Sequence, residues 1–445
     1  MVIKRELVLN IPDTRKTRVV IIGGGFGGVN LAQQLPADRF QVVLFSNQNY
    51  HGFWPLLYQV ATAGLEAEAI TEPLRKLFEG HQDFHFRPIR VTAVNPATKT
   101  VTSLLGELRY DQVVIATGTK ANFFGNEQLR KLAFPLKQVS DAVDLRSQLL
   151  QTFEMAQLAP TEAARQPMLN IVIAGGGPTG VELAGALAEM RTHVLPKDYP
   201  HVDYRKMNIY LVESGEQVLG PMSAASGKRA RQDLETLGVT IKTNTRVQNY
   251  DGATVLLSTG EKVATHTLIW AAGVTGAVLD GLPPETLEKG RYLVNEFNQV
   301  QGFEDVFALG DIALMKTSAY PKGHPGVAQP AIQQGQHLAK NLCLAPGEPW
   351  QPFSYFDKGS LVIVGRYKAV ADLPGDRHLG GFLAWGAWVF VHIFYLVGFR
   401  NKLVVLTNWL YKFFTYQSGT RTIITPFARE EDAAAQEFIN RQQAE

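Results

Sequence analysis

The feature that most constrains this chain is a glycine-rich motif that occurs twice, each time between a short apolar run and an amphipathic run. The first copy follows the apolar run Val19–Ile22 and has the spacing G-x-G-x-x-G. In a strand–turn–helix setting, the first glycine permits a tight turn, the second lets the backbone approach a pyrophosphate, and the third allows the helix to pack closely on the strand. The motif therefore predicts a dinucleotide-binding site. Its residues are Gly23, Gly24, Gly25, Phe26, Gly27 and Gly28.

The second copy of the motif follows the apolar run Ile171–Ala174. Two copies predict an α/β protein with two Rossmann-like dinucleotide-binding domains. The economical interpretation is an FAD that stays bound and an NADH that comes and goes, because hydride transfer between those two rings is the chemistry such a pair supports. The residues of this copy predicted to bind the nicotinamide dinucleotide are Gly175, Gly177, Pro178, Thr179 and Gly180.

The length of 445 residues suits two or three domains. The chain is expected to leave the first dinucleotide-binding domain through a helical connector and to return to it after the second. The predicted boundaries are 16–165 for the first part of an FAD-binding domain, 166–300 for an NADH-binding domain, 301–355 for the second part of the FAD-binding domain, and 356–430 for a C-terminal membrane-associating region.

Composition excludes several classes of function. A net charge of +2, with no clustered basic groove and no zinc-finger spacing, argues against a nucleic-acid partner. Cys343 is the single cysteine, so the chain lacks the redox-active cysteine pair of disulfide reductases and of sulfide-oxidising quinone reductases. Its flavin is therefore expected to pass electrons directly to an outside acceptor. The N-terminal sequence has no apolar core typical of a secretory signal, which predicts a location in the cytosol or on the cytoplasmic face of the cell membrane.

The residue that follows the second strand of each dinucleotide-binding domain usually contacts the adenosine ribose of the cofactor, so its side chain predicts which cofactor binds. In the first domain this position is Ser46, followed by Asn47, where an acidic residue is usual. Both side chains can hydrogen-bond a ribose but carry no charge. In the second domain Glu213 fills the acidic position, and its carboxylate would accept hydrogen bonds from the ribose of NADH but repel the 2′-phosphate of NADPH.

Other candidate residues lie at strand ends and helix starts. The backbone of Val91 is expected beside the adenine, Asp311 on the ribityl hydroxyls, and small-residue turns close to the two dinucleotides. Those turns contain Thr117, Gly118 and Gly273. Glu182 is expected in the first turn of the second motif's helix, where it either favours the helix dipole or, as a candidate catalytic residue, orients the nicotinamide or relays a proton.

Two further stretches leave alternatives open. Gln329 and Gln333 lie one helical turn apart, so they are either polar surface residues or amides presented to a ligand carbonyl. The aromatic-rich stretch Asn49–Leu65 is either a buried loop and helix start or a wall beside the flavin.

The C-terminal region has a different composition from the rest. Leu379–Phe399 contains no Asp, Glu, Lys or Arg, and Leu403–Phe414 is a second apolar, aromatic run. The first run is long enough to span a bilayer, which takes about 20 residues. It could equally lie in the membrane interface or form a dimer interface. We favour membrane contact, and we keep a homodimer as a further expectation.

Taken together, these residues resemble the type II NADH:quinone oxidoreductases, single-subunit flavoproteins that do not pump protons. The specific signatures are the paired glycine motifs, PLLYQVATAG at Pro55–Gly64, VFALGD ending at Asp311, and AQPAIQQG at Ala328–Gly335. The resemblance implies a glutathione-reductase-like architecture, FAD and NADH as cofactors, a membrane quinone as acceptor, and a C-terminal region that lies on the bilayer surface. It also implies that Ala328 contacts the cofactor, that Gln329 and Gln333 lie beside the quinone, and that Glu182 lies near the nicotinamide.

Two other functions remain as alternatives to this interpretation. One is an NADH-dependent reductase of a soluble electron-carrier protein, which would not need an aromatic, lipid-seeking C-terminal region. The other is a signalling flavoprotein whose response to NADH is binding rather than turnover. Turnover with a water-soluble quinone analogue separates the main interpretation from both.

Overall fold

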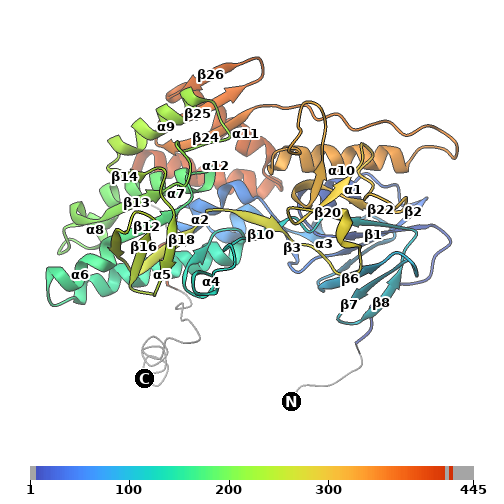
Figure 1. Cartoon of the computed structure of the whole chain (residues 1–445), viewed down its shortest axis with the longest axis horizontal. Coiled ribbons are helices and arrows are strands. Elements are labelled where there is room, and N and C mark those ends of the chain that lie inside the picture. Colours follow the sequence, from blue (N-terminus) through green and yellow to red (C-terminus); the bar gives the residue numbers. More distant parts are fainter. Residues whose placement is uncertain (1–6, 416–419, 424–445) are drawn as a thin grey trace. The chain divides into compact units, whose positions relative to one another are not determined.

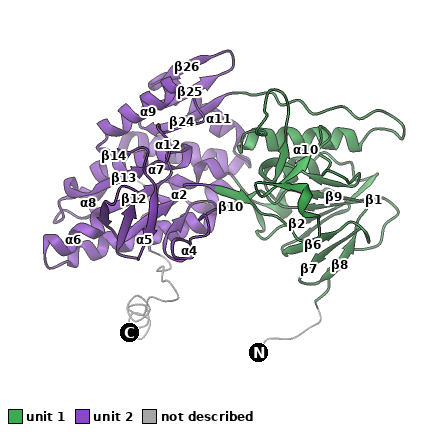
Figure 2. Cartoon of the chain, in the orientation of Figure 1, with its two compact units in different colours: residues 1–52, 72–120, 274–358 green, residues 53–71, 121–273, 359–445 purple. Residues whose placement is uncertain are grey.

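The computed structural model describes residues 7–415 and 420–423, and these divide into two compact units (Figures 1 and 2). Unit 1 contains residues up to 52, residues 72–120 and residues 274–358. Unit 2 contains residues 53–71, residues 121–273 and the described residues from 359 onward. Each unit is built around a parallel sheet with helices, as the two glycine motifs predict.

Unit 1 contains a parallel sheet with the strand order β22-β9-β1-β2-β5. The central strands β1 and β2 are almost entirely buried, as expected for parallel strands covered on both faces. Helices α1 and α10 pack closely: a Cβ atom on Gly335 would lie 2.5 Å from the carbonyl oxygen of Gly27. The strands are β1 (Thr17–Ile22), β2 (Phe40–Phe45), β5 (Phe84–Arg87), β9 (Gln112–Ile115) and β22 (Val306–Ala308), and the helices are α1 (Phe26–Ala32), α3 (Leu74–Leu77) and α10 (Ala328–Leu342).

Smaller sheets complete this part of the chain. An antiparallel sheet consists of β6 (Val91–Asn95), β7 (Thr100–Ser103) and β8 (Gly106–Arg109), and another sheet of β20 (Leu287–Glu288), β21 (Arg291–Val294) and β23 (Ala313–Met315). The remaining pairs are β3 (Tyr50–Gly52) with β4 (Thr71–Pro73), and β10 (Thr119–Ala121) with β19 (Val274–Gly276).

Unit 2 contains a second parallel sheet, with the strand order β11-β18-β12-β13-β14. Its strands are β11 (Phe134–Pro135), β12 (Asn170–Ala174), β13 (Asn208–Val212), β14 (Val239–Lys242) and β18 (Thr267–Trp270). The helices that precede the C-terminal region are α2 (Leu57–Ala61), α4 (Glu127–Leu132), α5 (Val139–Leu158), α6 (Glu162–Leu169), α7 (Pro178–His193), α8 (Leu195–Asp198) and α9 (Ala224–Thr236). An antiparallel sheet consists of β15 (Val247–Tyr250), β16 (Thr254–Leu257) and β17 (Lys262–Ala264).

The C-terminal region adds an antiparallel sheet and two helices to unit 2. The sheet consists of β24 (Ser360–Gly365), β25 (Lys368–Leu373) and β26 (Arg377–Gly380), and the helices are α11 (Phe382–Tyr395) and α12 (Phe399–Thr415). Helix α11 packs against β24 and β25, and both α7 and α9 also pack on this hairpin. Of the predicted region 356–430, residues 416–419 and 424–430 lie outside the described residues.

The structure corrects one interpretation of the apolar run Leu379–Phe399. The spanning interpretation needs one continuous helix, but the run is divided between β26, the 14-residue helix α11 and the start of α12. Gly381 and Gly398 mark the breaks with positive φ angles of 70° and 86°. Among the helices of residues 7–415, none is both long enough and apolar enough to cross a membrane.

The units also differ from the predicted domains. The predicted boundaries place residues 121–165 in the FAD-binding domain and residues 356–430 in a separate region, but residues 121–165 and the described residues from 359 onward pack within unit 2. Because the predicted boundaries divide the chain by ligand and the units divide it by packing, the ligand-binding boundaries stay a prediction.

Candidate functional site

The glycine loop of unit 1 has the geometry that a pyrophosphate requires. Gly23 has φ +125°, and a Cβ atom there would lie 2.1 Å from the carbonyl oxygen of Ala116. A Cβ atom on Gly28 would lie 2.1 Å from the carbonyl oxygen of Gly23. At Gly25 the same test finds no described atom within 4 Å, so this residue faces open space. The first and third glycines thus shape the turn, and the second leaves room for a ligand.

The predicted FAD residues of unit 1 gather at one edge of its parallel sheet. Asp311, Thr117, Gly23 and Ser46 follow the adjacent strands β22, β9, β1 and β2, respectively. Because the strands are parallel, their carboxyl ends lie on the same edge, where dinucleotides bind in such sheets. Ser46 lies against the loop, since a Cβ atom on Gly24 would be 3.2 Å from its Oγ.

The other predicted FAD residues lie around this edge in different ways. Gly118 follows Thr117 with φ +66°, and the Thr117 hydroxyl donates to the carbonyl of Ala277 at 2.7 Å. Asn47 is exposed beside Ser46. Val91 begins β6, and its side chain is buried in the core, which leaves its backbone as the part able to face a ligand.

Asp311 is held by groups that the sequence analysis did not identify. The hydroxyl of Thr119 donates to Asp311 Oδ2 at 3.3 Å, and the backbone N–H of Gly310 donates to Gln334 Oε1 at 2.7 Å. Gln334 is only 2% exposed. The available signal was its spacing from Ala331 and Leu338, which places a glutamine on the buried face of α10. With the open glycine loop, this arrangement fits an FAD.

Unit 2 repeats the glycine loop. Gly175 has φ +109°, with a notional Cβ 2.4 Å from the carbonyl oxygen of Ala271, and a Cβ on Gly180 would lie 1.9 Å from the carbonyl oxygen of Gly175. Gly177 has no described atom within 4 Å of its Cβ position. Pro178 is the first residue of α7, where a missing N–H costs no hydrogen bond. Thr179 follows it in the first turn.

Glu213 is fixed against this loop. It follows β13, and its Oε2 accepts the backbone N–H of Gly176 at 2.6 Å, while its Oε1 accepts that of Gly215 at 2.6 Å. A Cβ atom on Gly176 would lie 2.9 Å from Glu213 Cβ, so this position requires glycine. Gly176 is not among the predicted site residues, although it belongs to the run of three glycines at Gly175–Gly177. Gly273 follows β18 with φ +154°, at the same edge.

Glu182 is buried, which corrects its expected place. It lies in the second turn of α7, because that helix begins at Pro178, and it is 8% exposed. Burial raises the pKa of its carboxyl to about 8, although the backbone of Ile363 and the indole of Trp388 act in the opposite direction. The carboxyl is therefore mostly neutral at pH 7, and a favourable interaction of its charge with the helix dipole does not explain its presence.

A chain of hydrogen-bonded side chains, which we call the Tyr58 network, lies in the same unit. It consists of Tyr58, Gln59 and Trp409: Gln59 Nε2 donates to the Tyr58 hydroxyl at 2.8 Å, and Trp409 Nε1 donates to Gln59 Oε1 at 2.8 Å. Burial and the charge of Glu182 raise the pKa of Tyr58 well above its ordinary value. Glu182 is therefore close enough for electrostatic interaction with a network that reaches α12.

Helix α12 makes further side-chain hydrogen bonds to residues 59–71. Asn401 Nδ2 donates to the carbonyl of Thr71 and Asn408 Nδ2 to Glu66 Oε2, both at 2.8 Å. Residues 57–61 form α2, which is buried and packs against α5 and α7. The helix start predicted within Asn49–Leu65 is thus buried, and its use as a wall beside the flavin stays a prediction.

Gln329 and Gln333 both bond to the segment 355–358. Gln333 Nε2 donates to the carbonyl of Phe356 at 2.9 Å, and Gln333 Oε1 accepts the N–H of the same residue at 3.0 Å. Gln329 Oε1 accepts the N–H of Lys358 at 3.1 Å. Ala328 is the first residue of this helix. The two amides thus share a direction, as their spacing predicts, and hold a neighbouring backbone segment.

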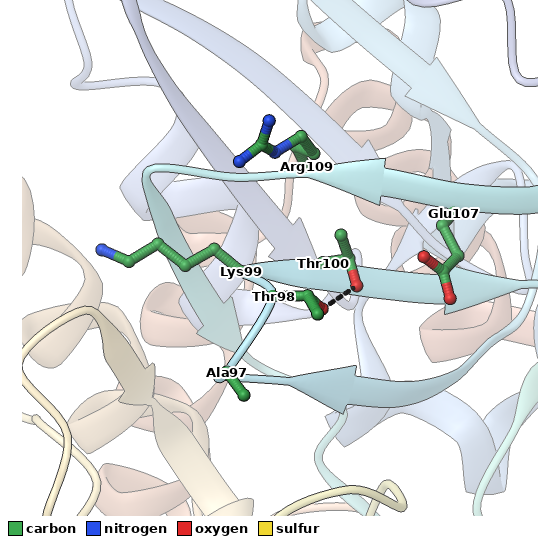
Figure 3. A pocket seen from close by; sticks show the side chains of 6 residues that line it. All are labelled: Ala97, Thr98, Lys99, Thr100, Glu107 and Arg109. Atoms are coloured by element: carbon green, nitrogen blue, oxygen red, sulfur yellow. Dashed lines mark hydrogen bonds between the residues drawn. The ribbon is translucent and has the colours of Figure 1, made fainter.

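A surface hollow lies on the β6–β7–β8 sheet of unit 1 (Figure 3). Lys99 on its rim forms an ion pair with Asp305 at 2.8 Å. Its lining residues are Ala97, Thr98, Lys99, Thr100, Glu107 and Arg109, and none of them is a predicted site residue.

Comparisons with known proteins cover nearly the whole chain. The family model of pyridine nucleotide-disulphide oxidoreductases matches residues 17–335, and that of the NDH2 C-terminal domain matches residues 358–416. The type II NADH:quinone oxidoreductase Ndh of Mycobacterium tuberculosis is 35% identical, over 92% of this chain and 90% of the relative. The internal alternative NAD(P)H-ubiquinone oxidoreductase A1 of Solanum tuberosum is 28% identical, over 89% and 86%.

Solved structures agree with the fold. The structure of NDH2 from Plasmodium falciparum in complex with NADH matches with a TM-score of 0.85 at 21% identity, and the match covers 92% of this chain and 100% of that one. The sulfide:quinone oxidoreductase of Aquifex aeolicus matches less well, with a TM-score of 0.67 at 18% identity over 89% and 95%. Because a family model covers most of the chain and a relative at 35% identity covers 92% of it, the chain belongs to the type II NADH:quinone oxidoreductases.

Proposed function

We infer that this chain is a respiratory-type NADH:quinone oxidoreductase with FAD as its resident cofactor. The observation that carries this function is the pair of glycine loops, each at the carboxyl edge of a parallel sheet and each with an open second glycine. When bound, FAD supplies the two-electron chemistry that links a hydride donor to a quinone. A single cysteine in the sequence leaves no internal disulfide to receive those electrons.

We propose that the residues of unit 1 hold FAD along the carboxyl edge of its sheet. The loop at Gly25 takes the pyrophosphate, and Ser46 and Asn47 hydrogen-bond the adenosine ribose. The backbone of Val91 lies beside the adenine, and the turn at Thr117 and Gly118 lies along the dinucleotide. Asp311 accepts hydrogen bonds from the ribityl hydroxyls, and Gln334 keeps the Asp311 turn in place through Gly310.

We propose that unit 2 binds NADH, with Glu213 on the adenosine ribose. Glu213→Gln should narrow the preference for NADH over NADPH at least about fivefold, because it removes a charge that repels the 2′-phosphate by ~1 kcal/mol or more. Glutamine keeps an oxygen to accept the N–H of Gly176. The measurement is the ratio of kcat/KM for the two cofactors. Glu216→Gln makes the same charge change on an exposed side chain and should leave the ratio unchanged.

An unchanged ratio in Glu213→Gln would contradict the assignment of the carboxylate. A loss of both activities together would mean instead that Glu213 serves the loop alone, through its hydrogen bonds to Gly176 and Gly215.

We propose that the first turns of α10, with the segment 355–358 that they hold, form one wall of the quinone site. Gln333→Ala removes two hydrogen bonds to Phe356, each of ~0.5–1.5 kcal/mol, so reoxidation of the flavin by quinone should slow by about tenfold. Reduction by NADH should stay nearly unchanged. Stopped-flow measurement of the two half-reactions, with a water-soluble quinone analogue as acceptor, gives both rates.

The control for this experiment is Gln336→Ala on the same helix, whose amide bonds to Asn30 and not to the segment. It should leave the quinone step unchanged. Equal slowing of both half-reactions in Gln333→Ala would assign the residue to the fold, and wild-type flavin that NADH reduces but quinone does not reoxidise would overturn the proposed function.

We also propose that α11 and α12 bind the surface of the bilayer, on the cytoplasmic face of the cell membrane. Large apolar side chains project from both helices into solvent, which is the pattern of an interfacial helix. Those with at least 38% exposure are Phe382, Leu383, Phe390, Phe394, Phe399, Leu403, Leu406, Leu410, Tyr411 and Phe414. A homodimer remains a second proposed use of the same side chains.

A further inference from the structure

Phe124 is an exposed aromatic residue beside the predicted NADH site. Its side chain is 68% exposed, and its backbone has φ +52°. A left-handed backbone is unfavourable for a bulky residue, and such conformations cluster at functional sites. Phe124 is not among the residues predicted from the sequence.

The ring of Phe124 is fixed over the turn that follows β18. Its backbone N–H donates to Asn122 Oδ1 at 2.9 Å, and the N–H of Asn122 donates to the carbonyl of Gly273 at 3.1 Å. The Trp270 indole N–H donates to the carbonyl of Asn122 at 2.8 Å. A Cβ atom on Gly273 would lie 3.0 Å from Phe124 Cζ. One edge of the ring therefore covers the turn, and most of the ring is left to solvent.

The strand order of unit 2 gives the direction of a bound dinucleotide. Strand β12 lies between β13 and β18 (Figure 1). From β12 the chain passes to β13 and β14 on one side, and only later to β18 on the other side. Dinucleotides bind at such a reversal of strand order, along the carboxyl ends. Glu213 follows β13 on one side of the glycine loop, and Gly273 follows β18 on the other. A dinucleotide with its adenosine ribose at Glu213 and its pyrophosphate at Gly177 must extend toward β18.

We propose that Phe124 forms an apolar wall for the nicotinamide half of NADH. This inference rests on the proposed NADH site of unit 2 and adds a residue to it. An exposed ring of this kind offers a face or an edge to the nicotinamide, and aromatic pairs favour both arrangements. Binding of the ligand then explains the strained backbone of Phe124. The left-handed backbone keeps the ring over the turn, where a ligand can reach it, and prevents the ring from folding onto the protein.

The test compares two ligands that differ in the nicotinamide alone. ADP-ribose carries the adenosine, the pyrophosphate and the second ribose of NAD⁺, but no nicotinamide. Calorimetric titration of the oxidised, FAD-loaded enzyme measures both affinities without turnover. Phe124→Ala should weaken NAD⁺ binding by about five- to tenfold and change ADP-ribose binding by less than about twofold. Phe124→Tyr, which keeps the ring, should restore NAD⁺ affinity.

A second variant separates this role from a structural one. Phe124→Gly removes the ring at a position where φ +52° suits glycine, so its melting temperature should not fall below that of wild type. Its NAD⁺ affinity should fall as in Phe124→Ala. Leu158→Ala, an exposed apolar residue at the end of α5, should change neither ligand.

Failure of this inference is distinguishable from failure of the proposed function. Equal weakening of NAD⁺ and ADP-ribose by Phe124→Ala, or no change in either, would overturn the inference while the NADH site stands. If Glu213→Gln leaves the ratio of kcat/KM for NADH and NADPH unchanged, or if the wild-type enzyme does not bind ADP-ribose at all, the proposed site itself is wrong.

Discussion

Glu182→Gln should make this enzyme more stable, and the gain should grow as the pH rises. The folded-state pKa of the Glu182 carboxyl is about 8, against a reference value of 4.5. Between these values the folded state binds the proton and the unfolded state does not, so the wild type loses stability with rising pH. Glutamine does not titrate. The free energy of unfolding of the variant, relative to wild type, should increase by about 3 to 4 kcal/mol from pH 5 to pH 8.

Urea unfolding of the FAD-loaded enzyme in detergent, at several pH values, measures this difference. Glu216→Gln, an exposed carboxyl in the same unit, should show a difference that does not change with pH. A pH-independent difference for Glu182→Gln would mean that the carboxyl is already ionised in the folded protein. If Glu182 also relays a proton, the pH dependence of flavin reduction by NADH should lose its inflection near pH 8 in this variant.

Replacing Phe390 and Phe394 together with aspartate should release the enzyme from membranes. These rings are 71% and 62% exposed, lie one turn apart on α11 and stack with centroids 6.2 Å apart. Insertion of each ring into lipid contributes ~1.5–3 kcal/mol to membrane binding, and aspartate removes this contribution. The membrane partition coefficient of the double variant should therefore fall by about 10² to 10⁴. Co-sedimentation with lipid vesicles measures the change.

Leu104→Asp is the control, because this leucine is 74% exposed but lies on the turn between β7 and β8. It should leave membrane binding unchanged. If the double variant sediments with vesicles as wild type does, another surface binds the membrane. If the double variant still binds vesicles but no longer forms a dimer that the wild type forms, these rings belong to a subunit interface.

Truncation before Leu379 is a poor test of the same idea. Trp388 on α11 is 1% exposed, and Trp409 on α12 bonds to the buried amide of Gln59. Removing these helices would expose Glu182 and break the Tyr58 network, so a released protein would also be a misfolded one. Point changes on the exposed side chains keep the buried face intact.

The parts of the site that could be predicted are those that local pattern determines. Gly23 and Gly175, at φ +125° and +109°, could be predicted from the sequence, because residues other than glycine are strained at these angles. Ser46, Thr117 and Asp311 follow apolar runs, and parallel strands bring such ends to one edge without any further information. The same reasoning placed Glu213 beside the second loop, where it lies.

The parts that could not be predicted depend on partners far away in the chain. Glu182 is buried because Trp388 and Tyr58 lie near it. The sequence of α7, which contains Glu182, does not indicate either neighbour. Gln59 and Trp409 are 350 residues apart. In the C-terminal region, hydropathy averaged over Leu379–Phe399 hid the breaks, although Gly381 and Gly398 were the available signal for them.

The hydrogen bonds between α12 and residues 59–71 also affect how the chain folds during synthesis. Gln59 leaves the ribosome 350 residues before its partner Trp409, which at ~5–20 residues per second is a delay of about 20 to 70 s. Until then, Gln59 lacks its hydrogen bond from Trp409, Glu66 lacks the one from Asn408, and Thr71 lacks the one from Asn401. The part of unit 2 around residues 59–71 is therefore expected to remain incompletely packed through most of translation. The helix that completes this packing, α12, is one of those that we propose touch the membrane, so docking on lipid is expected only after synthesis is nearly over.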